Sequence, residues 1–347
     1  MERLYEAAQA LALAEARRWM DGRLAQLAPL SGRSLSLATR SGIIAAVIDD
    51  WICDNWALAL ACGEACAAAR AGRLSAAHAQ WTDLWQRFWA SAAGHLAMDG
   101  AADTLALFFD GESSQHVLRW NRALDRALLD ETATALLSFL EEGEMHPSPV
   151  REAYAGRAEG EYADRSDGAE VPADGLDEAA VEILSTQGLS ALTFRAVARR
   201  AGTTLGSAAY HFGSKARMMR RAFDHLYRSS AEQPVLAGQA SPAELLQVTV
   251  GALVDERQPV LRAFDEIILY ICRGDEHAPL RGVIRGYRDP AATRVLESLL
   301  GRPGQVPPAL AAAFSSICRG LDHSSIAIGS VAMRETGMAV LAQFRGE

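Results

Sequence analysis

Residues 193–215 read TFRAVARRAGTTLGSAAYHFGSK and gather arginine, threonine, serine, tyrosine and lysine in one short stretch. Side chains of these types contact the phosphates and base edges of DNA. The window 172–228 holds eight basic and five acidic residues, whereas the whole chain has a formal charge of −9. A basic island in an acidic protein predicts a small DNA footprint, because phosphate repels the acidic remainder.

Short helices must position these side chains. Residues 174–187 place apolar side chains on one helical face, and Gly188 is a natural stop. Thr193 is predicted to cap a second helix, in which Val197 and Ala198 face inward while the arginines face solvent.

A tight turn then follows. Ala201-Gly202-Thr203 form the turn, with Gly202 free to take a positive φ. Thr204 is predicted to cap a third helix over 205–211, and a fourth runs from Lys215 to Arg228. Two short helices around a small-residue turn indicate a helix-turn-helix.

The segment resembles a known family in several ungapped blocks. LTFRAVA (192–198), AG (201–202) and GSAAYHFGSK (206–215) are similar to the DNA-binding domain of TetR-family transcriptional regulators. The resemblance covers about 50 residues, roughly 174–227. It implies an all-α protein that binds double-stranded DNA as a homodimer and responds to a small effector.

The resemblance also implies roles for single residues. Thr193, Thr204, Tyr210 and Lys215 are expected to contact phosphate, and Gly206 to allow close approach to the groove. Base edges are expected to be read by three side chains, those of Thr203, Leu205 and Ser207. The DNA-binding set is Thr193, Arg195, Thr203, Thr204, Leu205, Gly206, Ser207, Tyr210, His211 and Lys215. For His211 a packing role is the alternative, and Arg217, Arg220 and Arg221 can equally form a solvated face.

The remainder of the chain predicts further helices. Half of the residues are hydrophobic, mostly Ala and Leu, and β-branched alternation is scarce. Before the basic segment we expect long helices, which are 49–69, 75–96 with Ser75 as N-cap, and 114–142 with Ser114 as N-cap. After it we expect 241–256, 259–272, 289–300 and 308–344, the last broken near Gly320 or Gly329. The N-terminus has no signal-peptide pattern and no uncharged run could span a bilayer, so the expected location is the cytoplasm, with no membrane partner.

Aromatic residues gather in the first part of the chain. All seven tryptophans lie before residue 121, and Trp81, Trp85 and Trp89 form an i,i+4 stripe. The stripe indicates either a packed core or a pocket for an apolar or aromatic ligand. The candidate pocket residues are Trp81, Trp85, Trp89, Phe264 and Tyr270.

Cysteines and enzyme motifs complete the inventory. Cys62 and Cys66 share a helix face and are either buried apolar side chains or, less simply, a thiol redox or metal sensor. No G-x-S-x-G, H-E-x-x-H or Glu-x-x-His motif is present, and the sole lysine, Lys215, precedes Ala216 rather than Ser or Thr. We therefore expect no enzymatic activity, no cofactor and no metal.

The domain order raises a question, because such a reading domain is usually N-terminal. We predict a helical body (1–145) like a TetR-family C-terminal domain, a linker (146–173), the helix-turn-helix domain (174–228) and a second helical ligand-binding and dimerisation body (229–347). Tandem ancestry, a start assigned too late, or an unrelated accessory body would each explain this order.

Two functions from different classes remain open. One is a ligand-responsive repressor that binds a palindromic operator as a dimer. The other is a degenerate regulator that acts as a dimerisation or interaction protein, with the front body pairing internally with residues 288–344. Ala209, where many members have an aromatic residue, and the acidic arm around Asp174 favour the second.

Overall fold

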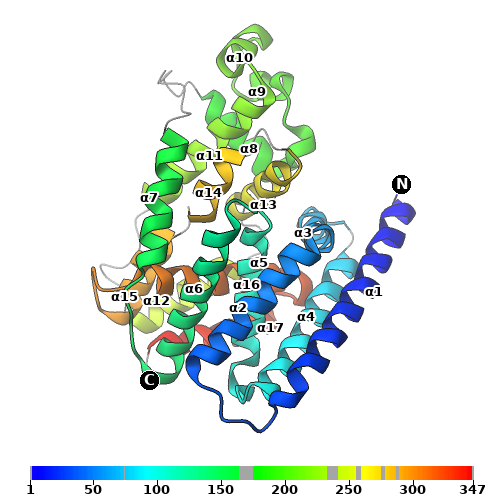
Figure 1. The fold of residues 1–347 in the computed structure, drawn as a ribbon. Helices are drawn as coiled ribbons and strands as arrows, with labels where there is room; N and C mark the ends of the chain where they lie inside the picture. Colours follow the sequence, from blue (N-terminus) through cyan, green and yellow to red (C-terminus); the bar gives the residue numbers. More distant parts are fainter. Residues whose placement is uncertain are drawn as a thin grey trace. The chain divides into compact units, whose positions relative to one another are not determined.

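The protein is almost entirely helical in the part of the chain that the structure describes. The computed structural model describes residues 2–73, 75–163, 175–232, 241–254, 259–274, 278–286 and 289–345, and no strand occurs among them (Figure 1). The all-α prediction is confirmed. No described helix is long and apolar enough to cross a membrane.

The helices follow one another with short connections. The described helices before the basic segment are α1 (Glu2–Leu27), α2 (Leu37–Asp54), α3 (Trp56–Arg70), α4 (Ser75–His95), α5 (Ala102–His116), α6 (Arg122–Glu142) and α7 (Pro149–Ala163). The basic segment forms α8 (Leu176–Gln187), α9 (Phe194–Arg200), α10 (Leu205–Phe212) and α11 (Lys215–Glu232). The rest are α12 (Pro242–Val254), α13 (Pro259–Cys272), α14 (Ala278–Gly286), α15 (Asp289–Leu300), α16 (Pro308–Ile328) and α17 (Ser330–Ala342).

The chain divides into two compact units that each combine distant segments. Unit 1 consists of 1–154, 235–256 and 288–347, and unit 2 consists of 155–234 and 257–287. Helices α12, α15, α16 and α17 therefore belong to the same unit as the front helices, whereas α13 and α14 belong with the basic segment. Unit 1 thus groups helices that precede the basic segment with helices that follow it.

Helix α16 is the centre of unit 1. It packs against α5 and α6, and nearly every residue from Ala309 to Ser325 is buried. The α5–α16 crossing depends on two glycines. A Cβ on Gly111 would lie 1.9 Å from the Ser316 carbonyl oxygen, and a Cβ on Gly320 would lie 2.1 Å from that of Leu107. Only glycine permits this approach of the two backbones.

Several predicted helix boundaries differ from the structure. The helix expected over 49–69 is interrupted at Asn55, which separates α2 from α3. Ser114 does not cap α6: it lies within α5, where its hydroxyl donates to the Gly111 carbonyl. Asn121 caps α6 instead, because its side chain accepts from the Leu124 amide.

The predicted linker is partly a helix. Residues 149–163 form α7, where Arg151 and Tyr154 are buried, and residues 164–173 lie outside the described part. Glu131 accepts bonds from the Val150 and Arg151 amides, which satisfies the start of the helix. The sequence pattern did not predict this helix, because charged residues and glycines interrupt its apolar residues. At the other end of the chain, α16 ends at Gly329 with φ 97°, whereas Gly320 lies inside the helix.

Candidate nucleic-acid interface

Two threonine caps define the ends of the short helices in unit 2. Thr193 Oγ1 accepts from the Ala196 amide at 3.1 Å and starts α9. Thr204 Oγ1 accepts from the Ser207 amide at 3.1 Å and starts α10. Between them Gly202 takes φ 65°, as expected for the turn. Both predicted caps and the helix-turn-helix geometry are confirmed.

Helix α10 presents an exposed face from its first residue to its last turn. Tyr210 is 92% exposed and Leu205 is 47% exposed, although both have large apolar surfaces. Side chains of this size left in water at the tip of a helix indicate a surface that meets a partner. The predicted residues on the exposed side are Thr193, Arg195, Thr203, Thr204, Leu205, Gly206, Ser207, Tyr210 and Lys215.

His211 is different from the other nine predicted residues. It is 7% exposed, and its Nε2 lies 3.1 Å from Asp177 Oδ1. A side chain held inside the domain does not reach base edges, so we correct its assignment from DNA contact to packing. The neighbouring Phe212 is also buried and stacks with Phe194, with ring centroids 6.2 Å apart.

Asp177 joins three helices of the domain. Besides His211 of α10, its carboxylate accepts bonds from Arg221 of α11, at 2.9 Å from Nε and 2.7 Å from NH2. Burial opposes ionisation of this carboxyl, yet the bonds from Arg221 and His211 hold its pKa below the usual value. The charged cluster therefore fixes α10 relative to α8 and α11. Sequence reasoning missed it because the three residues share no helical spacing.

The arginines of this region have different surroundings. Arg195 and Arg199 are exposed on α9, whereas Arg200 forms an ion pair with Glu182 of α8. Arg221 belongs to the Asp177 cluster, so the expectation that it forms part of a solvated face is wrong. Cationic side chains on α9 and at the start of α11 thus remain on the same domain as the exposed α10 face.

Helix α13 supports the domain from within unit 2. The Leu189 amide donates to Glu266 Oε2 at 3.2 Å, and Arg262 donates to the Thr186 carbonyl at 2.8 Å. Phe264 is buried and lies edge-to-face with Phe223 of α11, at 6.5 Å between centroids. A packing role for Phe264 follows from these contacts.

The residues of the predicted ligand pocket belong to two different units. Trp81, Trp85 and Trp89 are buried in unit 1, whereas Phe264 and Tyr270 lie on α13 of unit 2. Trp85 packs on Phe109 at 3.8 Å between centroids, and Trp81 Nε1 donates to Gln9. The cavity beside Trp81 and Trp85 measures about 20 Å³, which leaves room for about one water molecule. The tryptophan stripe is core, which was the alternative interpretation.

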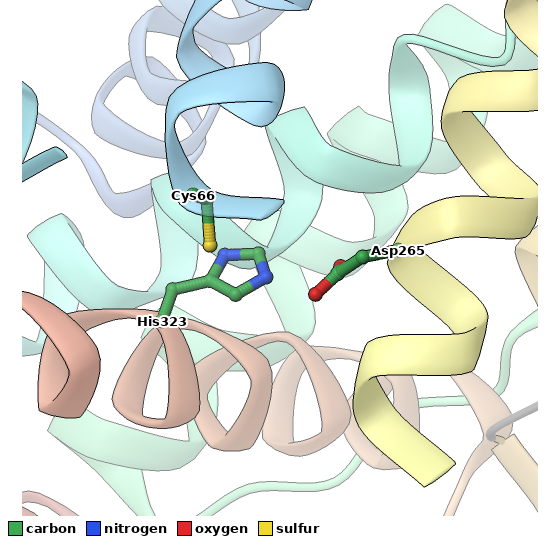
Figure 2. A group of neighbouring side chains, drawn as sticks. All are labelled: Cys66, Asp265 and His323. Atoms are coloured by element: carbon green, nitrogen blue, oxygen red, sulfur yellow. The ribbon is translucent and has the colours of Figure 1, made fainter. Parts of the chain in front are cut away.

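The core of unit 1 also contains a cysteine among histidines. Figure 2 shows Cys66 of α3 beside the imidazole of His323 of α16, and the Cys66 Sγ lies within 4.8 Å of a ring nitrogen. His323 Nδ1 is 2.6 Å from Asp110, and His78 is 2.9 Å from the His323 carbonyl.

This surrounding favours a negatively charged sulfur. Burial would raise the pKa of the Cys66 thiol, but His323 and His78 hold it well below its usual value. Burial likewise opposes protonation of His323, whereas Cys66 and Asp110 raise its pKa to about 9. His78 of α4 is not at metal-ligand spacing from Cys66 in the sequence, and the fold brings the two together.

Comparison with known proteins identifies the helix-turn-helix. Residues 177–222 match the family model described as bacterial regulatory proteins, tetR family. The matched segment spans α8 to the middle of α11 and includes the Asp177 cluster and the exposed α10 face. No curated protein and no solved structure matched the chain.

The class follows from the match together with the geometry. Residues 177–222 form a TetR-type helix-turn-helix domain in mid-chain, and domains of this type bind DNA in bacterial regulatory proteins.

Proposed function

We propose that this protein is a ligand-responsive TetR-type repressor that acts in the cytoplasm and binds a palindromic operator as a homodimer. The observation that carries the proposal is the exposed face of α10, a helix that Thr204 caps and on which Tyr210 is 92% exposed. In this arrangement α10 enters the major groove, with Thr203, Leu205 and Ser207 toward base edges.

Phosphate contacts come from groups at the edges of that face. The Tyr210 hydroxyl and the Lys215 ammonium are exposed and can each reach the backbone. Arg195 and Arg199 add positive charge on α9. The free backbone N–H groups at the starts of α9 and α10 favour an anion, although both helices are short.

One helix-turn-helix domain binds one half-site of a palindromic operator. Two half-sites on a B-DNA palindrome are about 34–36 Å apart, so a dimer is required to contact both. Because α16 is buried within its own chain, the partner subunit would have to contact another surface. Ile328 and Val331, 43% and 81% exposed where α16 meets α17, are candidates for that contact.

A second candidate function has a specific observation in its favour. Helices α5 and α6 cover α16, so the front part of the chain takes the place that a second subunit would need. This packing supports the alternative of an internally paired protein that binds partners without reading DNA specifically.

A gel-shift titration with the DNA upstream of its own gene, across a salt series and with the mass of the complex determined, separates the two. Two chains per DNA, with affinity falling steeply as salt rises, would support the repressor. A folded protein that shifts neither this DNA nor a pool of random duplexes would support the second function.

A further inference from the structure

The imidazole of His78, in the core of unit 1, has one bonded and one unbonded ring nitrogen. The side chain is 3% exposed, and its Nε2 lies 2.9 Å from the His323 carbonyl oxygen. Because a carbonyl oxygen only accepts, Nε2 carries the proton and donates. Nδ1 of the neutral imidazole is then a lone pair, and it is buried without a hydrogen-bond partner among the described residues.

Water in the neighbouring cavity does not supply the missing partner. His78 lines the cavity of about 20 Å³ beside Trp81, but its Nδ1 exposes less than 1 Å² and is therefore closed off from that cavity. A buried polar atom without a partner costs free energy, so it calls for an explanation. The group that this imidazole adjoins is the side chain of Cys66, which is 4% exposed.

The Cys66 sulfur is a metal ligand by its chemistry. A metal ion displaces the proton of a thiol that it binds, so the sulfur and Nδ1 of His78 would face an ion as two electron-pair donors. Figure 2 shows the imidazole of His323 on the same sulfur, with a ring nitrogen within 4.8 Å of it. Thiolate sulfur and imidazole nitrogen are ligands that soft metal ions prefer.

The carboxylates around this pair are already engaged. Asp110 lies 2.6 Å from His323 Nδ1. Asp322 accepts from Arg70 at 2.5 and 3.1 Å and from Arg319 at 3.2 Å. Mg²⁺ and Ca²⁺ require several oxygen ligands, and structural Zn²⁺ takes four ligands. One sulfur and one nitrogen suit Cu⁺, which thiolate ligands select and which is stable between two soft ligands.

We propose that Cys66 Sγ and His78 Nδ1 form a buried two-coordinate site for Cu⁺, in which the ion lies between α3 and α4. His323 positions both ligands, because its carbonyl fixes the tautomer of His78 and its imidazole adjoins the sulfur. A regulatory role for this ion rests on the proposed function, but binding itself does not.

The test is competition for Cu⁺ between the full chain and the coloured chelators bathocuproine disulfonate and ferrozine, without oxygen and without DNA. Both ligand atoms are reached through local opening of the helices, so each mixture stands until its absorbance is constant. We expect one Cu⁺ per chain, and X-ray absorption at the copper edge should show one sulfur and one nitrogen ligand. A folded protein that takes Cu⁺ from neither chelator, or copper bound by sulfur alone, would overturn the proposal.

Two substitutions test the ligands. His78→Gln keeps an amide N–H to donate to the His323 carbonyl but has no atom in place of Nδ1. It should weaken Cu⁺ binding more than about a hundredfold, beyond the usual effect of a group that only orients a ligand. Cys66→Ala removes the sulfur and should abolish binding. A variant of either kind that keeps its melting temperature and its affinity for Cu⁺ contradicts the site.

The matched control is Cys53→Ser. The Cys53 thiol donates to Asp49, and a hydroxyl can do the same, so this variant should bind Cu⁺ as the unchanged protein does. Equal losses in Cys53→Ser and Cys66→Ala would show that copper binds to thiols without selection. Zn²⁺ titration tests the choice of ion, because Zn²⁺ bound more tightly than Cu⁺ and lost in His78→Gln would reject copper.

Because no DNA is present, this result is independent of the gel shift. Copper binding by a protein that fails to shift DNA would retain the site and reject the repressor. The converse result would retain the repressor and reject the copper site.

Discussion

His211 Nε2 lies 3.1 Å from Asp177 Oδ1, which fixes the exposed helix α10 to α8, the first helix of its domain. Arg221 holds the same carboxylate from α11. The orientation of α10 therefore depends on three side chains that do not themselves face DNA. Substitutions of the residues that orient α10 and of the residues proposed to contact DNA are therefore expected to have different effects.

Asp177→Ala is expected to destabilise unit 2 and abolish DNA binding. The change leaves buried His211 and half-buried Arg221 without their anion, and removing one partner of such a pair costs about 3 kcal/mol. Urea unfolding of the full chain measures the loss. Glu182→Gln, which breaks the exposed pair with Arg200, is the matched control and should cost less than about 1 kcal/mol. Equal effects of the two changes would contradict a special role for Asp177.

Tyr210→Ala and Lys215→Ala should weaken DNA binding about equally on every sequence. Both side chains are exposed and are assigned to phosphate, which carries no sequence information. Binding to the operator and to random duplexes, measured at several salt concentrations, checks this. Lys215→Ala should also lower the salt dependence by about one ion, because a cation is lost. Binding that is unchanged in both variants contradicts the proposed docking of α10.

Changes at Thr203, Leu205 or Ser207 should alter sequence preference instead. These side chains lie on the exposed start of α10, where base edges would be met. A lost contact to the preferred base is expected to cost about 1–3 kcal/mol, with little effect on random DNA. Selection of bound sequences from a random pool, before and after each change, gives the readout. A uniform loss on all sequences would reassign the residue to phosphate.

Gly320→Ala and Gly22→Ala are expected to change stability in opposite directions. A Cβ at 320 would lie 2.1 Å from the Leu107 carbonyl oxygen, so α5 and α16 must separate, at a cost of about 3 kcal/mol or more. A Cβ at 22, inside α1 and more than one turn before its end, meets nothing within 4 Å. That change should add about 0.5–1 kcal/mol through helix propensity. Melting curves of both variants test the close crossing, and similar curves would argue against it.

Acid should selectively remove the stabilisation that Glu112 provides. Burial opposes its ionisation, but the hydrogen bond and charge of His116 lower its pKa from 4.5 to about 2. A carboxyl with a lowered pKa in the folded state stabilises above its unfolded pKa, and this contribution is lost as pH falls from about 4.5 to 2. Glu112→Gln should therefore cost several kcal/mol at pH 7 and much less near pH 2.5. A cost that does not change with pH would show that Glu112 acts by shape alone.

Local sequence patterns were sufficient to predict the helices and the turn of the helix-turn-helix domain. Thr193, Gly202 and Thr204 determine caps and a turn within a few residues, so their geometry follows from their types. The exposed position of Tyr210 follows from helical spacing in the same way. Such inferences need no knowledge of the rest of the chain.

The remaining features depend on partners distant in sequence. His211 and Asp177 are 34 residues apart, and Gly320 meets Leu107 across more than half of the chain. Nothing in the spacing of Cys66, His78 and His323 indicates that they meet. The tryptophan stripe was ambiguous for the same reason, because an aromatic row predicts burial without saying whether a cavity lies beside it.

The burial of α16 among helices from the front part of the chain has a consequence for synthesis. The ribosome releases the N-terminal helices long before α16 exists, so their inner apolar faces stay exposed while about two hundred further residues are added. Contacts of such sequence separation form slowly, because a long loop must close before they do. We expect the nascent front part to require chaperone protection, and a fragment ending at residue 145 to aggregate when expressed alone.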